Sequence, residues 1–174
     1  GIITTNNSNY YKQLKLLRNH GLKSRDEVVI SGYNSRLDTF QAVVGNWIIP
    51  KAVSISNQRI KNAKFFDDNL SKINGIKIPP RPKNFRLVYH LYIVFAERRN
   101  ELYEYCQNKG IECKIHYPIP MYRQKAMSHL KLRKKDFPIS EEHAKKIISF
   151  PCDQHLSVKE MKYIIKVVKD FYNK

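Results

Sequence analysis

Two short segments of the sequence combine ligand-binding side chains with residues that restrict the backbone. In the first, residues 32–36, an amide (Asn34) and a guanidinium (Arg36) follow a glycine. A guanidinium fork is suited to a carboxylate or a phosphate, and an uncharged amide can donate to the same anion. These residues therefore form a candidate anion-binding loop. The alternative is a loop that only caps the following helix, with Arg36 in solvent.

The second segment, residues 116–120, reads His-Tyr-Pro-Ile-Pro. An extended segment here runs into a turn that two prolines stiffen, and the turn holds the polar aromatic side chains of His116 and Tyr117 at a fixed place. Such a turn suits a substrate pocket, because binding residues are often carried on loops that a rigid scaffold positions. A purely structural turn is the alternative interpretation.

Metal and nucleophile chemistry have weaker support. Cys113-x-x-His116 and Cys152-x-x-His155 offer two thiols and two imidazoles, the donor set of a zinc site. Residues three apart on a strand point to opposite faces, so Cys113 and His116 cannot bind one ion from a regular strand. We therefore expect no metal site, and we interpret Cys106 and Cys113 as buried thiols. No spacing selects a third group for a catalytic triad, and the common phosphate-loop motifs are absent from the sequence.

Composition limits the class of protein. The chain has 174 residues, of which 42% are hydrophobic and 27% charged, so it is expected to fold as one ordinary domain or two small ones. Disorder and a fibrous structure are excluded, and the apolar runs are too short to cross a bilayer. Three cysteines form no even disulfide framework, which favours a reducing, cytoplasmic location.

The net charge of +17 favours an anionic partner, such as nucleic acid, a phosphorylated small molecule or an acidic protein. Lysines are spread along the whole chain, and only residues 81–86 and 131–135 form basic clusters. Biased codon usage is an equally good explanation for this composition. A nucleic-acid-binding module that uses residues 131–135 therefore stays open as an alternative function.

Periodicity predicts the elements that position these segments. In the first half we expect a strand at residues 1–5, a helix that Asn7 or Ser8 caps and that ends before Gly21, a loop over residues 22–36, and a long helical stretch from Asp38 to residue 74 that Pro50 interrupts. Because Gly1 opens within an expected strand, we expect the sequence to be part of a longer polypeptide.

In the second half, the pattern predicts a small sheet covered by helices. Ser157 and Glu160 form a capping box at the start of the last helix. The expected strands include Ile78, residues 88–95 and residues 111–117, and the expected helices are residues 99–109, 140–148 and 157–172.

Eight motifs occur in a characteristic order and spacing, together with Arg59: residues 1–6, 18–21, 32–38, 40–42, 90–92, 110–111, 116–120 and 150–157. Taken together, they resemble the C-terminal half of the DegT/StrS-type sugar aminotransferases, which are pyridoxal 5′-phosphate (PLP) enzymes of fold type I. The Pro-Cys-Asp-Gln-His-Leu-Ser string at residues 151–157 looks closest to members that make dTDP-linked 3-amino deoxysugars. The resemblance covers essentially the whole chain.

This resemblance implies an α/β fold: the tail of the large cofactor domain and long linking helices over residues 1–74, then a small C-terminal domain over residues 75–174. It implies amino transfer from an amino acid, with glutamate expected, to a nucleotide-linked keto-sugar carried on dTDP or UDP. The lysine that carries PLP as a Schiff base is expected upstream of Gly1. No catalytic residue would then lie in this chain, which alone would be inactive.

Site residues follow from the same resemblance. Asn34 would reach the PLP phosphate of a neighbouring subunit, which implies a homodimer, and Arg36 would lie near the carboxylate of the amino donor. His116 and Tyr117 match the turn that contacts the sugar, and Arg25 falls near a position that faces the nucleotide diphosphate. We expect no nucleic-acid or membrane partner. A fragment that folds with or regulates an aminotransferase without catalysing anything is a further alternative.

Overall fold

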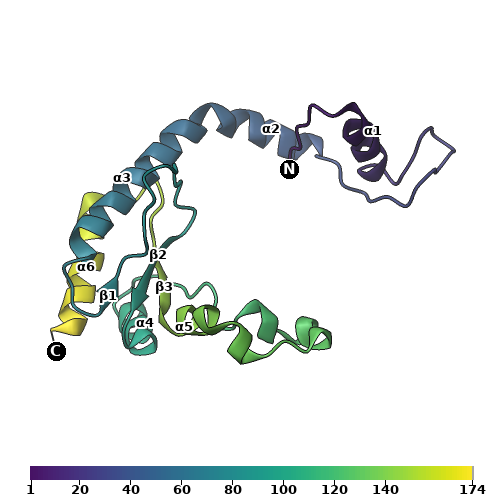
Figure 1. Ribbon diagram of the computed structural model, residues 1–174. Helices are drawn as coiled ribbons and strands as arrows, with labels where there is room; N and C mark the ends of the chain where they lie inside the picture. Colours follow the sequence, from purple (N-terminus) through teal and green to yellow (C-terminus); the bar gives the residue numbers. More distant parts are fainter. Residues whose placement is uncertain (174) are drawn as a thin grey trace. The chain divides into compact units, whose positions relative to one another are not determined.

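The computed structural model describes residues 1–173, and the chain divides into two compact units, Gly1–Ala52 and Val53–Lys174. Helices and short strands are mixed, so the α/β class is confirmed (Figure 1). None of the described helices is both long and apolar enough to cross a membrane. The helices are α1 (Ser8–Leu17), α2 (Thr39–Ile48), α3 (Ala52–Leu70), α4 (Arg99–Asn108), α5 (Pro138–Lys146) and α6 (Val158–Tyr172), and the strands are β1 (Ile76–Lys77), β2 (Tyr92–Ala96) and β3 (Ile147–Phe150).

The first unit contains α1, a long loop and α2. Asn7 caps α1 as expected, because its Oδ1 accepts from the backbone N–H groups of Asn9 and Tyr10 at 2.9 and 3.2 Å. Pro50 interrupts the next helical stretch as expected, in a single 3₁₀ turn (Ile49–Lys51) between α2 and α3. The strand predicted at residues 1–5 is wrong. A strand needs a neighbour, and this segment pairs with no other strand of the described chain.

In the second unit, β1, β2 and β3 form an antiparallel sheet in that order. Strand β2 lies in the centre, with Ile76 opposite Ala96 on one side and Tyr92 opposite Phe150 on the other. Helix α6 begins at the predicted capping box, in which Ser157 and Glu160 each accept a hydrogen bond from the other's backbone.

One predicted strand and one predicted helix need correction. Residues 111–114 alternate between buried and exposed, but residues 111–117 do not form a strand, since within the described chain only Lys114 pairs, in an isolated bridge with Ser149 of β3. Pro118 and Pro120 follow and have no backbone N–H, so the ladder cannot continue through the turn. The helix predicted over residues 140–148 ends at Lys146, and the next four residues form β3 instead.

The core of this unit lies against one face of β2. Tyr92, Val94 and Ala96 are buried there, and the ring of Phe66 from α3 lies 5.1 Å from that of Tyr92. Helices α4 and α6 contribute further apolar side chains to the same core. On the opposite face, Phe95 packs against His143 of α5, with ring centroids 4.6 Å apart.

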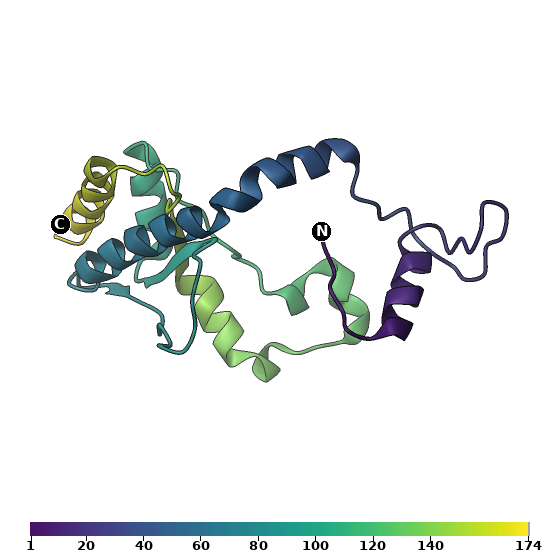
Figure 2. The ribbon, with the colours of Figure 1, turned by 90° about the horizontal axis from the view of Figure 1, so that it is seen from above.

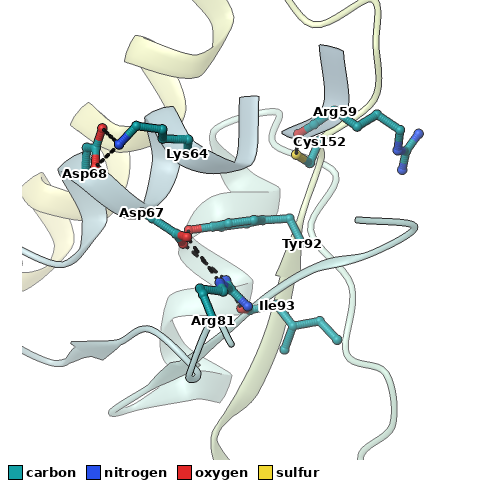
Figure 3. A network of polar contacts seen from close by, with 8 residues as sticks. All are labelled: Arg59, Lys64, Asp67, Asp68, Arg81, Tyr92, Ile93 and Cys152. Carbon is teal, nitrogen blue, oxygen red and sulfur yellow. Dashed lines mark hydrogen bonds and ion pairs between the residues drawn. The ribbon is translucent and has the colours of Figure 1, made fainter. Parts of the chain in front are cut away.

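A polar network within the core fixes the link that follows β1 (Figure 3). Arg81 donates from Nε and Nη2 to the two carboxylate oxygens of Asp67 on α3, both at 3.1 Å. The buried Tyr92 hydroxyl donates to Asp67 Oδ1 at 2.8 Å. Burial, and then the hydrogen bond to Asp67, raise the pKa of Tyr92 far above its ordinary value. Asp67 therefore ties the proline-rich link and the central strand to α3.

The boundary after Ala52 separates two units that each have more contacts within themselves than with the other. Helix α3 contributes Ala63, Phe66 and Leu70 to the core of the second unit. The boundary at residue 74 refers to the domains of a complete enzyme, and it stays a prediction.

Candidate functional site

The loop of residues 32–36, called here the Asn34 loop, is fastened to the end of α1. The His20 N–H donates to the Tyr33 carbonyl at 2.8 Å, and the Ser35 N–H donates to the Arg18 carbonyl at 2.9 Å. Asn34 lies between these two bonds and forms an isolated bridge with Asn19. The backbone that carries the Asn34 amide is thus held on both sides.

Two glycines allow this close approach. Gly21 has a φ of +74°, and a Cβ there would lie 1.7 Å from the Ile30 carbonyl oxygen. A Cβ on Gly32 would lie 2.2 Å from the Gly21 nitrogen. Both distances are far below van der Waals contact, so the fold of the Asn34 loop requires glycine at each position.

Within this loop, Arg36 Nε donates to Asn34 Oδ1 at 3.1 Å, and both side chains are exposed. The bond uses the acceptor end of the amide, which leaves the Nδ2 amino group to donate to a ligand. An amide donor beside a guanidinium is suited to a phosphate or a carboxylate. The structure therefore brings Asn34 and Arg36 together, as an anion site requires.

Arg25 lies in the same unit, in the loop that the bridge between Leu22 and Val28 closes. Its side chain is exposed, and Lys23 and Glu27 form an ion pair on either side of it at 3.4 Å. The structure places Arg25 on a loop of the first unit, with no hydrogen bond or ion pair to Asn34 or Arg36 among the described residues.

In the second unit, residues 116–120, called here the His116 turn, follow the bridge between Lys114 and Ser149. His116 is half-buried, and its Nδ1 lies 3.1 Å from the Ser149 hydroxyl oxygen. Tyr117 is 71% exposed and packs edge-on against the imidazole with ring centroids 5.5 Å apart. The two predicted substrate residues are adjacent, with His116 anchored and Tyr117 open to solvent.

The segment after this turn extends away from the sheet and returns at α5 (Figure 2). Its anchor is Glu141 of α5, which is 7% exposed and accepts a hydrogen bond from the Tyr122 hydroxyl. Arg123 and Lys134 lie 3.6 and 3.8 Å from its carboxylate oxygens. The hydrogen bond from Tyr122, and then these cationic neighbours, lower the pKa of Glu141. Sequence reasoning missed this anchor, because the partners lie far apart in the chain.

All three cysteines are free and buried, as expected for Cys106 and Cys113. Burial raises the pKa of the Cys152 thiol to about 11, so this thiol is protonated and unreactive near neutral pH. Among residues 1–173, no three His, Cys, Asp or Glu side chains gather as metal ligands would.

Comparison with known proteins shows the family of the chain. The model of the DegT/DnrJ/EryC1/StrS aminotransferase family matches residues 1–169. A dTDP-3-amino-3,6-dideoxy-alpha-D-galactopyranose transaminase of Aneurinibacillus thermoaerophilus is 30% identical over 171 residues, which are 98% of this chain and 46% of that protein. A pleiotropic regulatory protein of Geobacillus stearothermophilus is 29% identical, over 99% of this chain and 47% of that protein.

Among solved structures, S. venezuelae DesV in complex with a ketimine intermediate superposes with a TM-score of 0.93 at 27% identity, over 98% of this chain and 46% of that one. The chain spans about half the length of the curated relatives that it matches. The resemblance seen in the sequence motifs is thus confirmed, and its fold is that of the C-terminal part of such a protein. The chain belongs to the DegT/DnrJ/EryC1/StrS aminotransferase family.

Proposed function

We propose that the polypeptide containing this chain is a PLP-dependent aminotransferase that transfers an amino group from an amino acid to a nucleotide-linked keto-sugar. The observation that carries the proposal is the family match over residues 1–169. Relatives named as transaminases of dTDP-linked and UDP-linked sugars support the substrate class. Glutamate is the amino donor that we expect.

The Asn34 loop fits the phosphate of PLP. A phosphate offers only acceptors at neutral pH, and the loop offers the Nδ2 amino group of Asn34 beside the Arg36 guanidinium. Asn34 would hold the phosphate, and the glycine-dependent fastening of the loop would keep it from swinging. When bound, PLP supplies the electron sink that the transfer of an amino group needs.

Other charged residues have separate roles in this proposal. Arg36, held by Asn34 through its Nε, would present its remaining guanidinium N–H groups to a carboxylate of the amino donor. Arg25, exposed on its loop, would face the diphosphate of the nucleotide. The net charge of +17 suits a substrate with two phosphates, and it gives the basic composition a specific use.

The sugar would contact the His116 turn. Its two aromatic side chains are adjacent, and Tyr117 is open to a ligand at 71% exposure. The C–H groups of a sugar ring pack on the face of an aromatic side chain, and the tyrosine hydroxyl or an imidazole nitrogen can hydrogen-bond to the sugar's oxygen atoms. We assign His116 and Tyr117 to substrate binding rather than to the chemical step, for which the lysine expected upstream would be responsible.

A homodimer is part of the proposal, because Asn34 would act in the site of a neighbouring subunit. The apolar stripe of α2 supports it. Four of its side chains, Phe40, Val43, Val44 and Trp47, are between 45% and 78% exposed within the chain. Exposed apolar side chains in a row at helical spacing are typical of a surface that another protein surface covers. We also propose a cytoplasmic location, which three free cysteines support.

One relative is named as a regulatory protein, but relatives named as transaminases favour the enzyme over the regulatory alternative, and no described residue favours the nucleic-acid-binding alternative. The basic cluster of residues 131–135 includes Lys134, whose ammonium lies near Glu141, so part of the cluster serves the protein's own fold. An activity assay of the complete polypeptide distinguishes an aminotransferase from a fragment that regulates without catalysing.

The test is an assay of the complete polypeptide that contains this chain, supplied with PLP, glutamate and a panel of dTDP- and UDP-linked keto-sugars. Formation of 2-oxoglutarate beyond one equivalent per PLP site should require both glutamate and one of the keto-sugars. A protein that binds PLP but forms no 2-oxoglutarate with any sugar of the panel would contradict the proposal.

A further inference from the structure

Ser149 is a buried polar residue in a strand that otherwise consists of apolar side chains. It is 4% exposed and lies between Ile148 and Phe150, which are also buried. Burying a hydroxyl costs free energy unless the hydroxyl is hydrogen-bonded. Within residues 1–173, the Ser149 hydroxyl has one hydrogen-bonding partner, Nδ1 of His116 at 3.1 Å.

The backbone of β3 does not require a serine at this position. The Ser149 N–H donates to the Lys114 carbonyl at 2.8 Å, and its carbonyl accepts from the Lys114 N–H at 3.0 Å. On the other side, Ser149 lies opposite Ile93 of β2. These contacts hold Ser149 beside Lys114, which lies two residues before His116 in the segment that leads into the His116 turn.

We propose that Ser149 is a positioning residue for His116: its hydroxyl donates to Nδ1 and fixes the neutral imidazole as the Nε2–H tautomer. The opposite arrangement, in which Nδ1–H donates to the Ser149 oxygen, leaves the buried hydroxyl proton with no acceptor among the described residues. A buried donor without an acceptor is costly, so donation by Ser149 is the favoured arrangement.

The consequence concerns what His116 offers to a ligand. With Nδ1 occupied as an acceptor, Nε2–H is a hydrogen-bond donor, and it is complementary to an oxygen acceptor such as a carbonyl or hydroxyl oxygen of a keto-sugar. Tyr117 packs edge-on against the same imidazole and limits its rotation. This assignment rests on the proposed function, because it deepens the role given there to His116 in sugar binding.

The test is a double-mutant cycle in the complete polypeptide with the keto-sugar acceptor that its panel assay identifies. Ser149→Ala should raise KM for the sugar about three- to tenfold, the effect of one weakened hydrogen bond, with kcat and PLP affinity nearly unchanged. In the His116→Ala background, Ser149→Ala should have no further effect on KM. Ser140→Ala, at an exposed position of α5, is the matched control and should not change KM.

Equal effects of Ser149→Ala in both backgrounds, or a fall in kcat and PLP affinity with unchanged KM, would show a structural role and overturn the inference. A second measurement does not need activity. Ring ¹⁵N resonances of His116 in the labelled polypeptide should show the Nε2–H pattern, and Ser149→Ala should mix the two tautomers. A pure Nδ1–H pattern in the unsubstituted protein would also overturn it. If no sugar is aminated while the Nε2–H pattern is present, the proposed function fails and the hydrogen bond stands.

Discussion

Asn34→Ala in the complete polypeptide should weaken PLP binding without removing any apolar contact. The exposed Asn34 side chain offers one donor group, Nδ2, because its Oδ1 accepts from Arg36 Nε at 3.1 Å. A hydrogen bond to a charged group contributes about 1.5–3 kcal/mol. Its loss corresponds to an increase of about ten- to a hundredfold in the dissociation constant of PLP.

The same substitution also removes the acceptor that holds Arg36, and Asn34→Asp separates the two effects. An aspartate can still accept from Arg36 Nε, but it has no donor and its charge repels a phosphate. We expect Asn34→Asp to bind PLP at least as weakly as Asn34→Ala. It should keep a KM for glutamate close to that of the unsubstituted protein, because Arg36 stays in place.

The assay is titration of the PLP-free protein with PLP, followed by absorbance, together with steady-state kinetics for glutamate. Asn108→Ala, at the exposed end of α4, is the matched control and should bind PLP normally. If Asn34→Ala binds PLP within about twofold of the unsubstituted protein, an effect too small for one such bond, the reasoning is refuted. The Asn34 loop would then be only a helix-capping loop.

Three further predictions concern the scaffold. Gly32→Ala should weaken PLP binding as Asn34→Ala does, because the added Cβ would lie 2.2 Å from the Gly21 nitrogen. Gly45→Ala is the control and should leave PLP binding unchanged, because its Cβ would meet nothing within 4 Å; the same PLP titration measures both variants. Asp67→Ala should lower the free energy of unfolding by about 2–3 kcal/mol, since it leaves the buried Tyr92 hydroxyl without its acceptor, whereas Tyr92→Phe should cost about 1 kcal/mol; equal losses in urea unfolding would contradict this. Trp47→Lys, in the exposed stripe of α2, should shift the polypeptide from dimer to monomer in sedimentation experiments, and an unchanged sedimentation coefficient would speak against the proposed interface.

The local parts of the fold could be predicted from the sequence because their signals lie within a few residues. The capping box of Ser157 and Glu160 and the cap at Asn7 are short-range patterns, and both helices begin where these patterns indicate. Pro50 marks a break for a covalent reason, the missing backbone N–H. These features do not depend on the rest of the chain.

The sheet could not be predicted in the same way, because strand pairing joins distant residues. Strand β3 has four residues, too few to show a period, and it extends directly from α5. The apolar residues of 111–117 alternate with polar ones as in a strand, yet among the described residues this segment pairs with the sheet only through the bridge between Lys114 and Ser149. The short segment of β3, which shows no alternation, is the third strand of the sheet instead.

The candidate site was only partly visible for the same reason. Asn34 and Arg36 are two residues apart, so their association follows from a short loop. The contact between His116 and Ser149 joins residues 33 apart, and the only sequence signal for it is a lone polar residue within the apolar run of β3. The anchor between Tyr122 and Glu141 left no comparable signal.

Transfer of isotope tests the central claim most directly. The complete polypeptide that contains this chain is incubated with [¹⁵N]glutamate, PLP and a panel of dTDP- and UDP-linked keto-sugars, and the nucleotide-sugars are then analysed by mass spectrometry. The account predicts that one of the sugars gains a ¹⁵N amino group in place of its carbonyl oxygen, in amounts equal to the 2-oxoglutarate formed. If glutamate is consumed but no nucleotide-sugar carries ¹⁵N, or if no glutamate is consumed with any sugar, the account is contradicted.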